Sequence, residues 1–310
     1  MPRWPVLGEL PAGILVEEAP GGVLAVRADY AAALRAQGFG AGGGEAQPSS
    51  DLAGRRPLGE LLAGDQRLVV RRFQHGGMLR WMMGRRFADP ERPFRELVLS
   101  ARLEELGIAT PRVVAARARR IPLGGFALDL VTLRVEGAID LAEWLEALRE
   151  GRVSARARRA VPRTAGTFVG RFHSAGLWHA DLNPRNLLLV GDALQAGTAA
   201  VQVLDLDRSV LGAGLPRERR LANLARLLRA VLRREGRGAP FLHRSDHARF
   251  LSAYLAAVGE PGEELGAAWR GVRAAFERSA ATHRAWWRVE EALGGGPATR
   301  DGRAVVRRRG

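Results

Sequence analysis

The sequence predicts an α+β fold in two lobes, the first rich in strands with one main helix and the second mostly helical. Strand-like apolar runs are concentrated in the first half of the chain, whereas helical spacing dominates the second half. A length of 310 residues suits one large domain or two lobes of ordinary size. Hydrophobic residues make up 46% and charged residues 26%, so the chain has enough apolar material for a packed core.

The composition excludes several kinds of chemistry. Cysteine is absent, which rules out a disulfide scaffold, a thiol nucleophile and a thiolate zinc site. The chain contains no lysine, so all 48 basic residues counted against 33 acidic ones are arginines, and the net charge is +15. This charge predicts anionic partners, although biased codon usage explains it equally well. We find no secretory signal and no stretch of about 20 apolar residues, so we expect a cytoplasmic protein.

Two glycine-rich stretches suggest the boundaries of the lobes. Residues 38–44 (GFGAGGG) read as a flexible linker after an N-terminal extension, and residues 294–297 (GGGP) precede an arginine-rich tail. We therefore divide the chain into four parts. These are an extension with its linker over 1–50, a strand-rich lobe over 51–133, a helical lobe over 134–293 and a basic tail over 294–310.

The elements of the first lobe follow from local patterns. Residues 67–73 (RLVVRRF) are apolar and β-branched, which is typical of a strand. Residues 93–106 are expected to form a helix, with proline near its start and Gly107 just past its end. Apolar residues alternate from Phe126, so residues 126–135 are a second strand.

The second lobe begins with a helix through Val161, Phe168 and Phe172 that stops at Gly176. Residues 187–190 and 201–204 are short apolar runs joined by a glycine-containing loop, which predicts a hairpin. Helical spacing returns over residues 221–231, and the remainder to about residue 293 is expected to be helical.

The most informative motif lies between the predicted helix and the hairpin. His179, Asp181 and Asn186 form the pattern H-x-D-x4-N, and Asp205 follows the second hairpin strand. The segment HADLNPRNLLL resembles the catalytic loop of the protein-kinase-like superfamily, and LDLD at residues 204–207 stands where that superfamily has D-F-G. The alternative is that these are turn and cap residues, but two such segments in this order and beside strands favour the kinase-like fold.

The resemblance implies a chemistry for each position. Phosphoryl transfer needs a carboxylate to accept the proton of the attacking hydroxyl and oxygen ligands that hold Mg²⁺ on the phosphates of ATP. Asp181 is then the catalytic base, and Asn186 and Asp205 are the Mg²⁺ ligands. Asp207 is either a contact to a second metal ion or a cap of the next turn. His179 is expected to be a scaffold residue with satisfied hydrogen bonds.

A kinase-like fold also needs a cation on an upstream strand, paired with a glutamate on the following helix. Arg71 lies on the predicted strand, and Glu96 shares a helical face with Leu99, Leu103 and Leu106. A charge on an apolar face is costly unless it is paired, so Arg71 is the expected partner of Glu96 and would contact the nucleotide phosphates. The alternative places Glu96 at the edge of the face, in solvent. Most of the superfamily has lysine where this chain has Arg71.

Two further nucleotide contacts are expected from position alone. Gly54 lies before the Arg71 strand, where a phosphate-covering turn belongs, although its surroundings do not form a G-x-G-x-x-G motif and a plain turn explains it equally well. Thr132 lies where the strand over 126–135 leads into the second lobe, so its backbone is a candidate to pair with adenine.

Details beyond the catalytic core resemble the Kdo (3-deoxy-D-manno-octulosonic acid) kinases of the lipopolysaccharide kinase family. The matching segments are residues 69–77, 107–116, 178–189, 204–209 and 223–227, within a resemblance that spans about 52–231. It implies transfer of the ATP γ-phosphate to a hydroxyl of a Kdo sugar on lipid A, by an enzyme bound peripherally to the cytoplasmic face of the inner membrane. The segment after Asp207 is short and lacks an A-P-E motif, which also argues against a protein substrate.

Two other functions remain open from the sequence. One is a kinase of the same fold that acts on heptose or another small molecule. The other is a non-catalytic kinase-like module that binds anions through its arginines, although three intact catalytic positions oppose it. A kinase of this kind is not expected to bind nucleic acid, whereas the non-catalytic module would bind nucleic acid or membrane.

Overall fold

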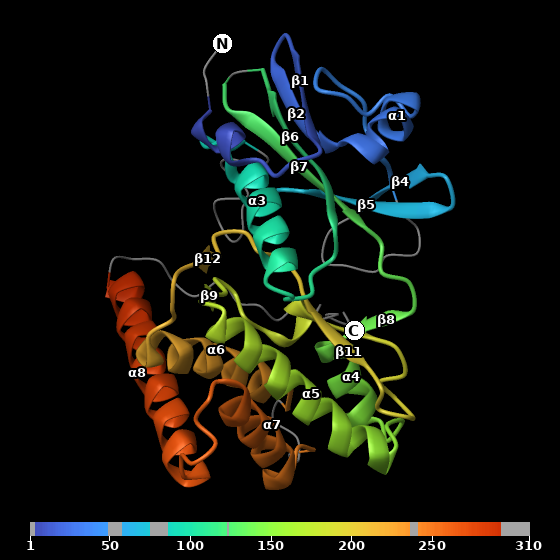
Figure 1. Ribbon diagram of the computed structural model, residues 1–310. Coiled ribbons are helices and arrows are strands. Elements are labelled where there is room, and N and C mark those ends of the chain that lie inside the picture. The colour runs from blue at the N-terminus through green and yellow to red at the C-terminus, as the bar shows by residue number, and fades with distance from the viewer. Residues whose placement is uncertain (1–3, 49–57, 75–85, 123, 236–240, 293–310) are drawn as a thin grey trace, which may run out of the picture.

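The computed structural model describes residues 4–48, 58–74, 86–122, 124–235 and 241–292, and it consists of a strand-rich lobe above a helical lobe (Figure 1). The predicted α+β, two-lobed fold is confirmed. The strand-rich lobe is one antiparallel sheet of seven strands in the order β1-β2-β6-β7-β5-β4-β3. Its strands are β1 (Ile14–Ala19), β2 (Gly22–Arg27), β3 (Gln47–Pro48), β4 (Gly59–Ala63), β5 (Gln66–Arg72), β6 (Val113–Arg120) and β7 (Phe126–Leu133).

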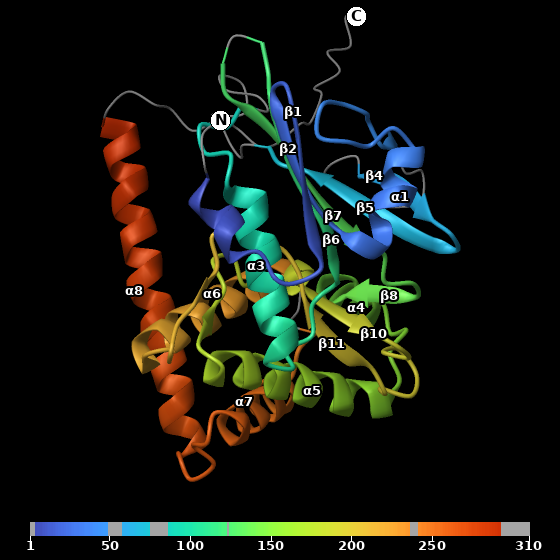
Figure 2. The same ribbon diagram turned by 45° about the horizontal axis from the view of Figure 1, so that its top comes forward.

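Helices cover both faces of this sheet. Helix α1 (Ala28–Ala36) packs Tyr30 and Leu34 on one face, and helix α3 (Arg92–Glu105) packs Phe94 and Leu97 on the other. A short 3-10 helix, η1 (Pro5–Glu9), lies against α3 (Figure 2). Because successive residues of a strand point to opposite faces, β5 sends Val70 toward α1 and Arg71 toward α3.

Residues 14–48 supply β1, β2 and β3 of this sheet together with helix α1, which corrects the expected extension and linker over 1–50. Strand β2 pairs with β6 along its length, and Leu24 and Val26 are fully buried in the core beneath α1. The glycine-rich stretch that we read as flexible is folded back on itself around Phe39, which is also fully buried. The tail expected over 294–310 lies outside the described residues.

Arg117 of β6 holds the glycine-rich stretch in place. It donates from Nη1 to the carbonyl oxygens of Gly40 (3.1 Å) and Gly43 (2.6 Å), while Nε and Nη2 bind Asp129 at 2.9 and 2.7 Å. Gly44 has a positive φ of 83°, and a Cβ there would stand 1.7 Å from the carbonyl oxygen of Gly38. These glycines therefore serve a tight turn and a close backbone approach, not flexibility.

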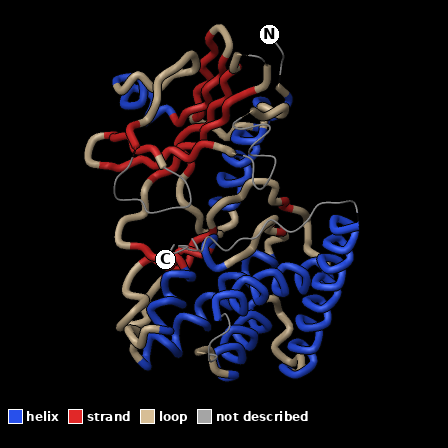
Figure 3. Tube along the Cα trace, turned by 180° about the vertical axis from the view of Figure 1, so that it is seen from behind, coloured by secondary structure: helices blue, strands red, loops and turns tan. Residues whose placement is uncertain are grey.

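The second lobe is a bundle of helices that carries two small sheets on its upper side (Figures 1 and 3). Its helices are α4 (Leu141–Arg149), α5 (Ala155–Ser174), α6 (Arg217–Glu235), α7 (Arg244–Ala257) and α8 (Leu265–Ala292). One sheet has the order β11-β10-β8, and in the other β9 pairs with β12. The strands are β8 (Ala138–Asp140), β9 (Leu177–Trp178), β10 (Leu187–Val190), β11 (Ala200–Val203) and β12 (Val210–Leu211).

Most predicted elements agree with the structure to within a few residues. The predicted strand at 67–73 is β5, the helix at 93–106 is α3 and the hairpin at 187–204 is formed by β10 and β11. Leu106 differs from its expected place on the apolar face of α3, because the helix ends one residue earlier and the side chain is 50% exposed. Among the described residues, no helix is long and apolar enough to cross a bilayer.

Candidate active site

His179 is the buried centre of the loop between β9 and β10. Its Nδ1 accepts a hydrogen bond from the backbone N–H of Asp181 (3.1 Å), so its Nε2 carries the hydrogen and donates to the carbonyl oxygen of Leu204 (2.9 Å). Burial lowers the pKa of His179, which keeps the ring neutral. The histidine therefore joins the Asp181 loop to the residue before Asp205, in agreement with the expected scaffold role.

Asn223 of α6 anchors this loop from below. Its Nδ2 donates to the carbonyl oxygen of His179 (2.8 Å), and its Oδ1 accepts from the backbone N–H of the same residue (3.2 Å). Oδ1 also lies 3.2 Å from Nε2 of His173, whose pKa burial lowers to about 4. The sequence analysis missed this role of Asn223. Its one signal was an asparagine within the apolar stripe of a helix.

Asp181 projects from the loop with its side chain 65% exposed. Its Oδ2 accepts from Nδ2 of Asn183 (3.1 Å), and its Oδ1 lies 3.5 Å from Nη1 of Arg226 on α6. Asn186, at the end of the 3-10 helix η2 (Pro184–Asn186), donates from Nδ2 to the main-chain oxygen of Asp181 (2.8 Å). The amide nitrogen of Asn186 is thus committed to the loop, and its amide oxygen is the atom suited to a metal ion.

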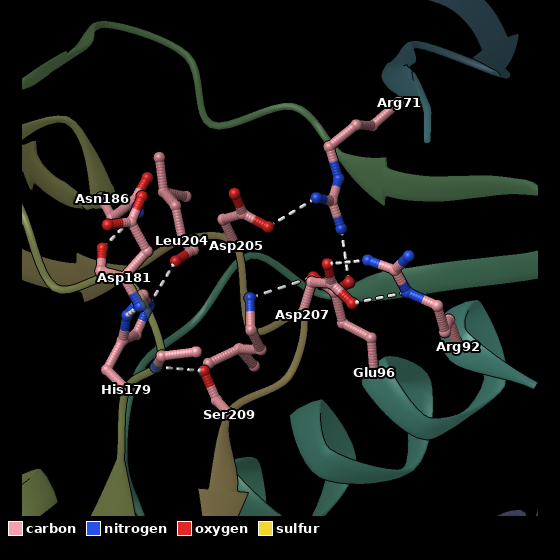
Figure 4. Close-up of polar contacts among 12 residues, drawn as sticks. Arg71, Arg92, Glu96, His179, Asp181, Asn186, Leu204, Asp205, Asp207 and Ser209 are labelled. Carbon is pink, nitrogen blue, oxygen red and sulfur yellow. Dashed lines mark hydrogen bonds and ion pairs between the residues drawn. The ribbon is translucent and has the colours of Figure 1, made fainter. Parts of the chain in front are cut away.

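Arg71 joins the two lobes (Figure 4). One nitrogen of its guanidinium, Nη2, pairs with Glu96 of α3, and the other, Nη1, lies 2.5 Å from Oδ1 of Asp205. The second oxygen of Glu96 accepts from the backbone N–H of Leu206 (3.1 Å). Glu96 is only 5% exposed, so the alternative that it reaches solvent is wrong.

The electrostatics of this group are dominated by burial. Burial raises the pKa of Glu96 to about 7, against the opposing effect of the Arg71 cation. Asp205 and Asp207 add negative charge nearby and raise the pKa of Glu96 further. Glu96, Asp205 and Asp207 thus lie beside two guanidiniums, those of Arg71 and Arg92, so the group has one carboxylate more than it has cations.

Asp207 turns away from Asp181 and Asn186 (Figure 4). Its carboxylate pairs with Arg92 at the start of α3, and the Oδ1–Nε distance is 3.2 Å. The Arg92 guanidinium also stacks over Phe87, 4.8 Å from the ring centre. The structure therefore gives Asp207 a third environment that neither alternative anticipated, an ion pair that ties α3 to the loop after β11.

The residues present fit a hard cation such as Mg²⁺. Asp205 has a positive φ of 56°, a strained conformation for a residue with a side chain, and it presents a partly exposed carboxylate beside the Asn186 loop. Within the described ranges, no three acidic or histidine side chains form a ready-made metal site. One carboxylate and one amide oxygen leave the remaining positions to phosphate and water, as is usual for Mg²⁺.

Gly54 and Thr132 are the two other residues that were expected to contact the nucleotide. Gly54 falls between β3 and β4, outside the described residues. Thr132 is the last residue but one of β7, where it stands opposite Val69 of β5 and Val113 of β6. The next two backbone N–H groups also donate within this lobe, to Arg112 and Arg67 (both 2.9 Å). The backbone of Thr132 therefore lies within the sheet, which does not support its expected pairing with adenine.

Comparison with known proteins now identifies the family. The family model described as Lipopolysaccharide kinase (Kdo/WaaP) matches residues 46–254. The chain belongs to this family. The match runs from β3 to α7, so β1, β2 and α1 of the first lobe lie outside the part that defines the Kdo/WaaP kinases.

Individual relatives agree with this assignment. A 3-deoxy-D-manno-octulosonic acid kinase of Stenotrophomonas maltophilia (strain K279a) is 32% identical over 192 residues, which are 60% of this chain and 70% of that protein. Its counterpart in Xanthomonas axonopodis pv. citri (strain 306) is 33% identical over 195 residues, 62% of this chain and 72% of the relative. The solved structure titled "WaaP in complex with acyl carrier protein" has a TM-score of 0.52 and 25% identity, over 77% of this chain and 88% of that one.

Membership of the Kdo/WaaP family fixes the general activity. The protein is a phosphotransferase that acts on a sugar hydroxyl, and it is a kinase of lipopolysaccharide core biosynthesis. The geometry above provides the frame for this chemistry, with residues of both lobes meeting at Arg71 and Asp205.

Proposed function

We propose that the protein transfers the γ-phosphate of ATP to a hydroxyl of a Kdo sugar on Kdo-lipid A, with Mg²⁺ as the cofactor. The observation that carries the proposal is the convergence of Arg71, Glu96 and Asp205 from two lobes, beside the loop that holds Asp181 and Asn186. The names of the curated relatives support the choice of Kdo as the acceptor sugar.

Asp181 is the proposed catalytic base. Its exposed carboxylate accepts the proton of the acceptor hydroxyl, the hydroxyl oxygen forms a bond to the γ-phosphorus, and the bond from that phosphorus to the β–γ bridging oxygen breaks. ADP leaves, and the proton passes from Asp181 to solvent. The backbone contact to His179 and the Asn183 amide orient Asp181 for this step.

Arg71, Asn186 and Asp205 are the proposed nucleotide and metal contacts. A guanidinium can bind phosphate oxygens through two parallel hydrogen bonds, so Arg71 can replace the usual lysine. Asn186 and Asp205 would hold Mg²⁺, which would neutralise the negative charge of the phosphates. Glu96 positions Arg71 and does not itself touch the nucleotide.

We further propose peripheral contact with the cytoplasmic face of the inner membrane, where the acceptor lipid resides. The net charge of +15, carried entirely by arginine, supports attraction to an anionic bilayer.

The direct test incubates purified protein with γ-labelled ATP, Mg²⁺ and Kdo-lipid A, and locates the label on the product by mass spectrometry. We expect one added phosphate on the Kdo residue. An Asp181→Asn variant should lose at least about a hundredfold in kcat while keeping the Tm of the wild type. Label on a heptose-containing acceptor but not on Kdo-lipid A would instead establish the heptose kinase alternative.

A further inference from the structure

A row of arginines on α6 begins beside the proposed catalytic base. Arg226 is 47% exposed, and its Nη1 lies 3.5 Å from Oδ1 of Asp181. Arg229 and Arg233 follow three and seven residues later, which places the three side chains on one side of the helix. Burial lowers the pKa of Arg229 most, and the nearby cations of Arg233 and Arg226 lower it further.

This row differs from the arginines at the start of the same helix. Arg217 and Arg220 are neutralised by Glu260 and Glu263. Within the described ranges, the acidic partner of Arg226 is the Asp181 carboxylate itself, and no acidic side chain pairs with Arg229 or Arg233. The first turn of α6 is therefore balanced, while the part of the helix that starts at Arg226, beside the catalytic loop, has an excess of positive charge.

The contact between Arg226 and Asp181 conflicts with the proposed chemistry. The Oδ1 atom of Asp181 that faces Arg226 is then less open to the hydroxyl of an acceptor. The contact is long, and both side chains are largely exposed, so little holds Arg226 in this position. A competing anion at the acceptor position would be enough to draw the guanidinium away.

We propose that Arg226 binds an anionic group of the acceptor, a carboxylate or a phosphate, next to the reacting hydroxyl, and that this binding removes Arg226 from Asp181. The inference rests on the proposed function and adds a source of acceptor selectivity to it. Water and neutral sugars carry no anionic group. With these acceptors Asp181 stays paired with Arg226, and phosphate transfer is slow. Arg233, which is exposed, extends the same positive surface for further anionic groups of the acceptor, whereas the Arg229 guanidinium lies over the ring of Phe276 on α8, 5.6 Å from its centre.

The test compares Arg226→Ala with Arg273→Ala, an exposed arginine of α8 that lies 3.7 Å from Glu277. Both variants lose one positive charge from the same lobe. We expect Arg226→Ala to raise the KM for Kdo-lipid A at least tenfold, with the KM for ATP within twofold of wild type and ATP hydrolysis without acceptor faster than in wild type. Arg226→Lys, which keeps the charge but loses the planar fork, should recover part of the acceptor affinity. Arg273→Ala should match the wild type.

Two modified acceptors identify the anion. If Arg226 binds the Kdo carboxylate, Arg226→Ala and wild type should have equal KM values for carboxyl-reduced Kdo-lipid A. If it binds a lipid A phosphate, the two should become equal with the dephosphorylated lipid. An unchanged acceptor KM in Arg226→Ala, or an equal rise in Arg273→Ala, would overturn the inference. A wild-type protein that transfers no phosphate to Kdo-lipid A would instead overturn the proposed function.

Discussion

Arg71 and Asp205 form an ion pair of 2.5 Å that joins β5 of the first lobe to the loop after β11 of the second. The other guanidinium nitrogen of Arg71 is held by Glu96 at the same time. A lysine has a single ammonium and cannot present this fixed fork to two carboxylates. In the proposed mechanism, Asp205 is the partner of Arg71 that would turn to a metal ion when the nucleotide binds, because its side chain is 44% exposed and that of Glu96 is 5% exposed.

The absence of lysine allows a direct test of this position. An acyl phosphate of ATP acylates lysines beside the nucleotide phosphates, so the wild-type protein should react at most at its terminal amine. We expect Arg71→Lys to be labelled at residue 71 and to be protected by excess ATP. Arg72→Lys is the matched control, because Arg72 points to the opposite face and pairs with Glu45 (3.0 Å). Equal labelling of the two variants, measured by peptide mass spectrometry, would show that the faces of β5 are misassigned.

Glu96 should make stability depend on pH. Its pKa is raised to about 7 in the folded protein, so the unfolded chain releases this proton at a lower pH than the folded one does. The free energy of unfolding should therefore fall as the pH rises from about 4.5 to 7 and level off above that.

Glu96→Gln should remove this dependence, which amounts to at most about 3 kcal/mol. Urea titrations of the two proteins at pH 5.5 and 8 measure the difference. If wild type and Glu96→Gln show the same pH profile, Glu96 is ionised throughout this range and its pairing with Arg71 outweighs burial.

The contact between Arg92 and Asp207 should act as a brace that keeps α3, and with it Glu96, in place. Because Arg92 and Asp207 are the two partners of a single ion pair, Arg92→Ala and Asp207→Asn should each lower kcat/KM for ATP by a similar factor, of about 3 to 30. The double variant should be little worse than either single one. If Asp207 were instead a metal ligand, Asp207→Asn alone would shift the Mg²⁺ concentration needed for half-maximal rate.

Asn223 should be required for both stability and rate. Asn223→Ala leaves two backbone groups of His179 unpaired in the interior, which should lower the free energy of unfolding by about 2–4 kcal/mol. The loop carrying Asp181 loses its anchor, so kcat should also fall. Ser174→Ala is a suitable comparison, since it removes one exposed hydrogen bond to Ala257 (3.1 Å) and should change stability by less than about 0.5 kcal/mol. Equal losses in the two variants would argue against the anchor.

The sequence allowed the main parts of the site to be located because their signals are local. Glu96 stood out as a charge on an apolar helical face, and Asp181, Asn186 and Asp205 as polar residues next to short strands. Arg226 and Arg92 had no such signal, since each meets its partner from a helix far away in the chain. Position along the strand did not show that Thr132 has paired strands on both sides, because those strands come from other parts of the chain.

The hydrogen bonds from Arg117 to the carbonyl oxygens of Gly40 and Gly43 also have a consequence for truncated forms of the protein. A chain cut near residue 50 would match the family model almost completely, yet it would lose β1, β2 and α1. The edge of β6 that pairs with β2 would then expose unpaired backbone N–H and C=O groups, next to exposed alanine and valine side chains. Strands of other molecules can pair with such an edge. Such a fragment should aggregate in solution even though it retains all the proposed catalytic residues.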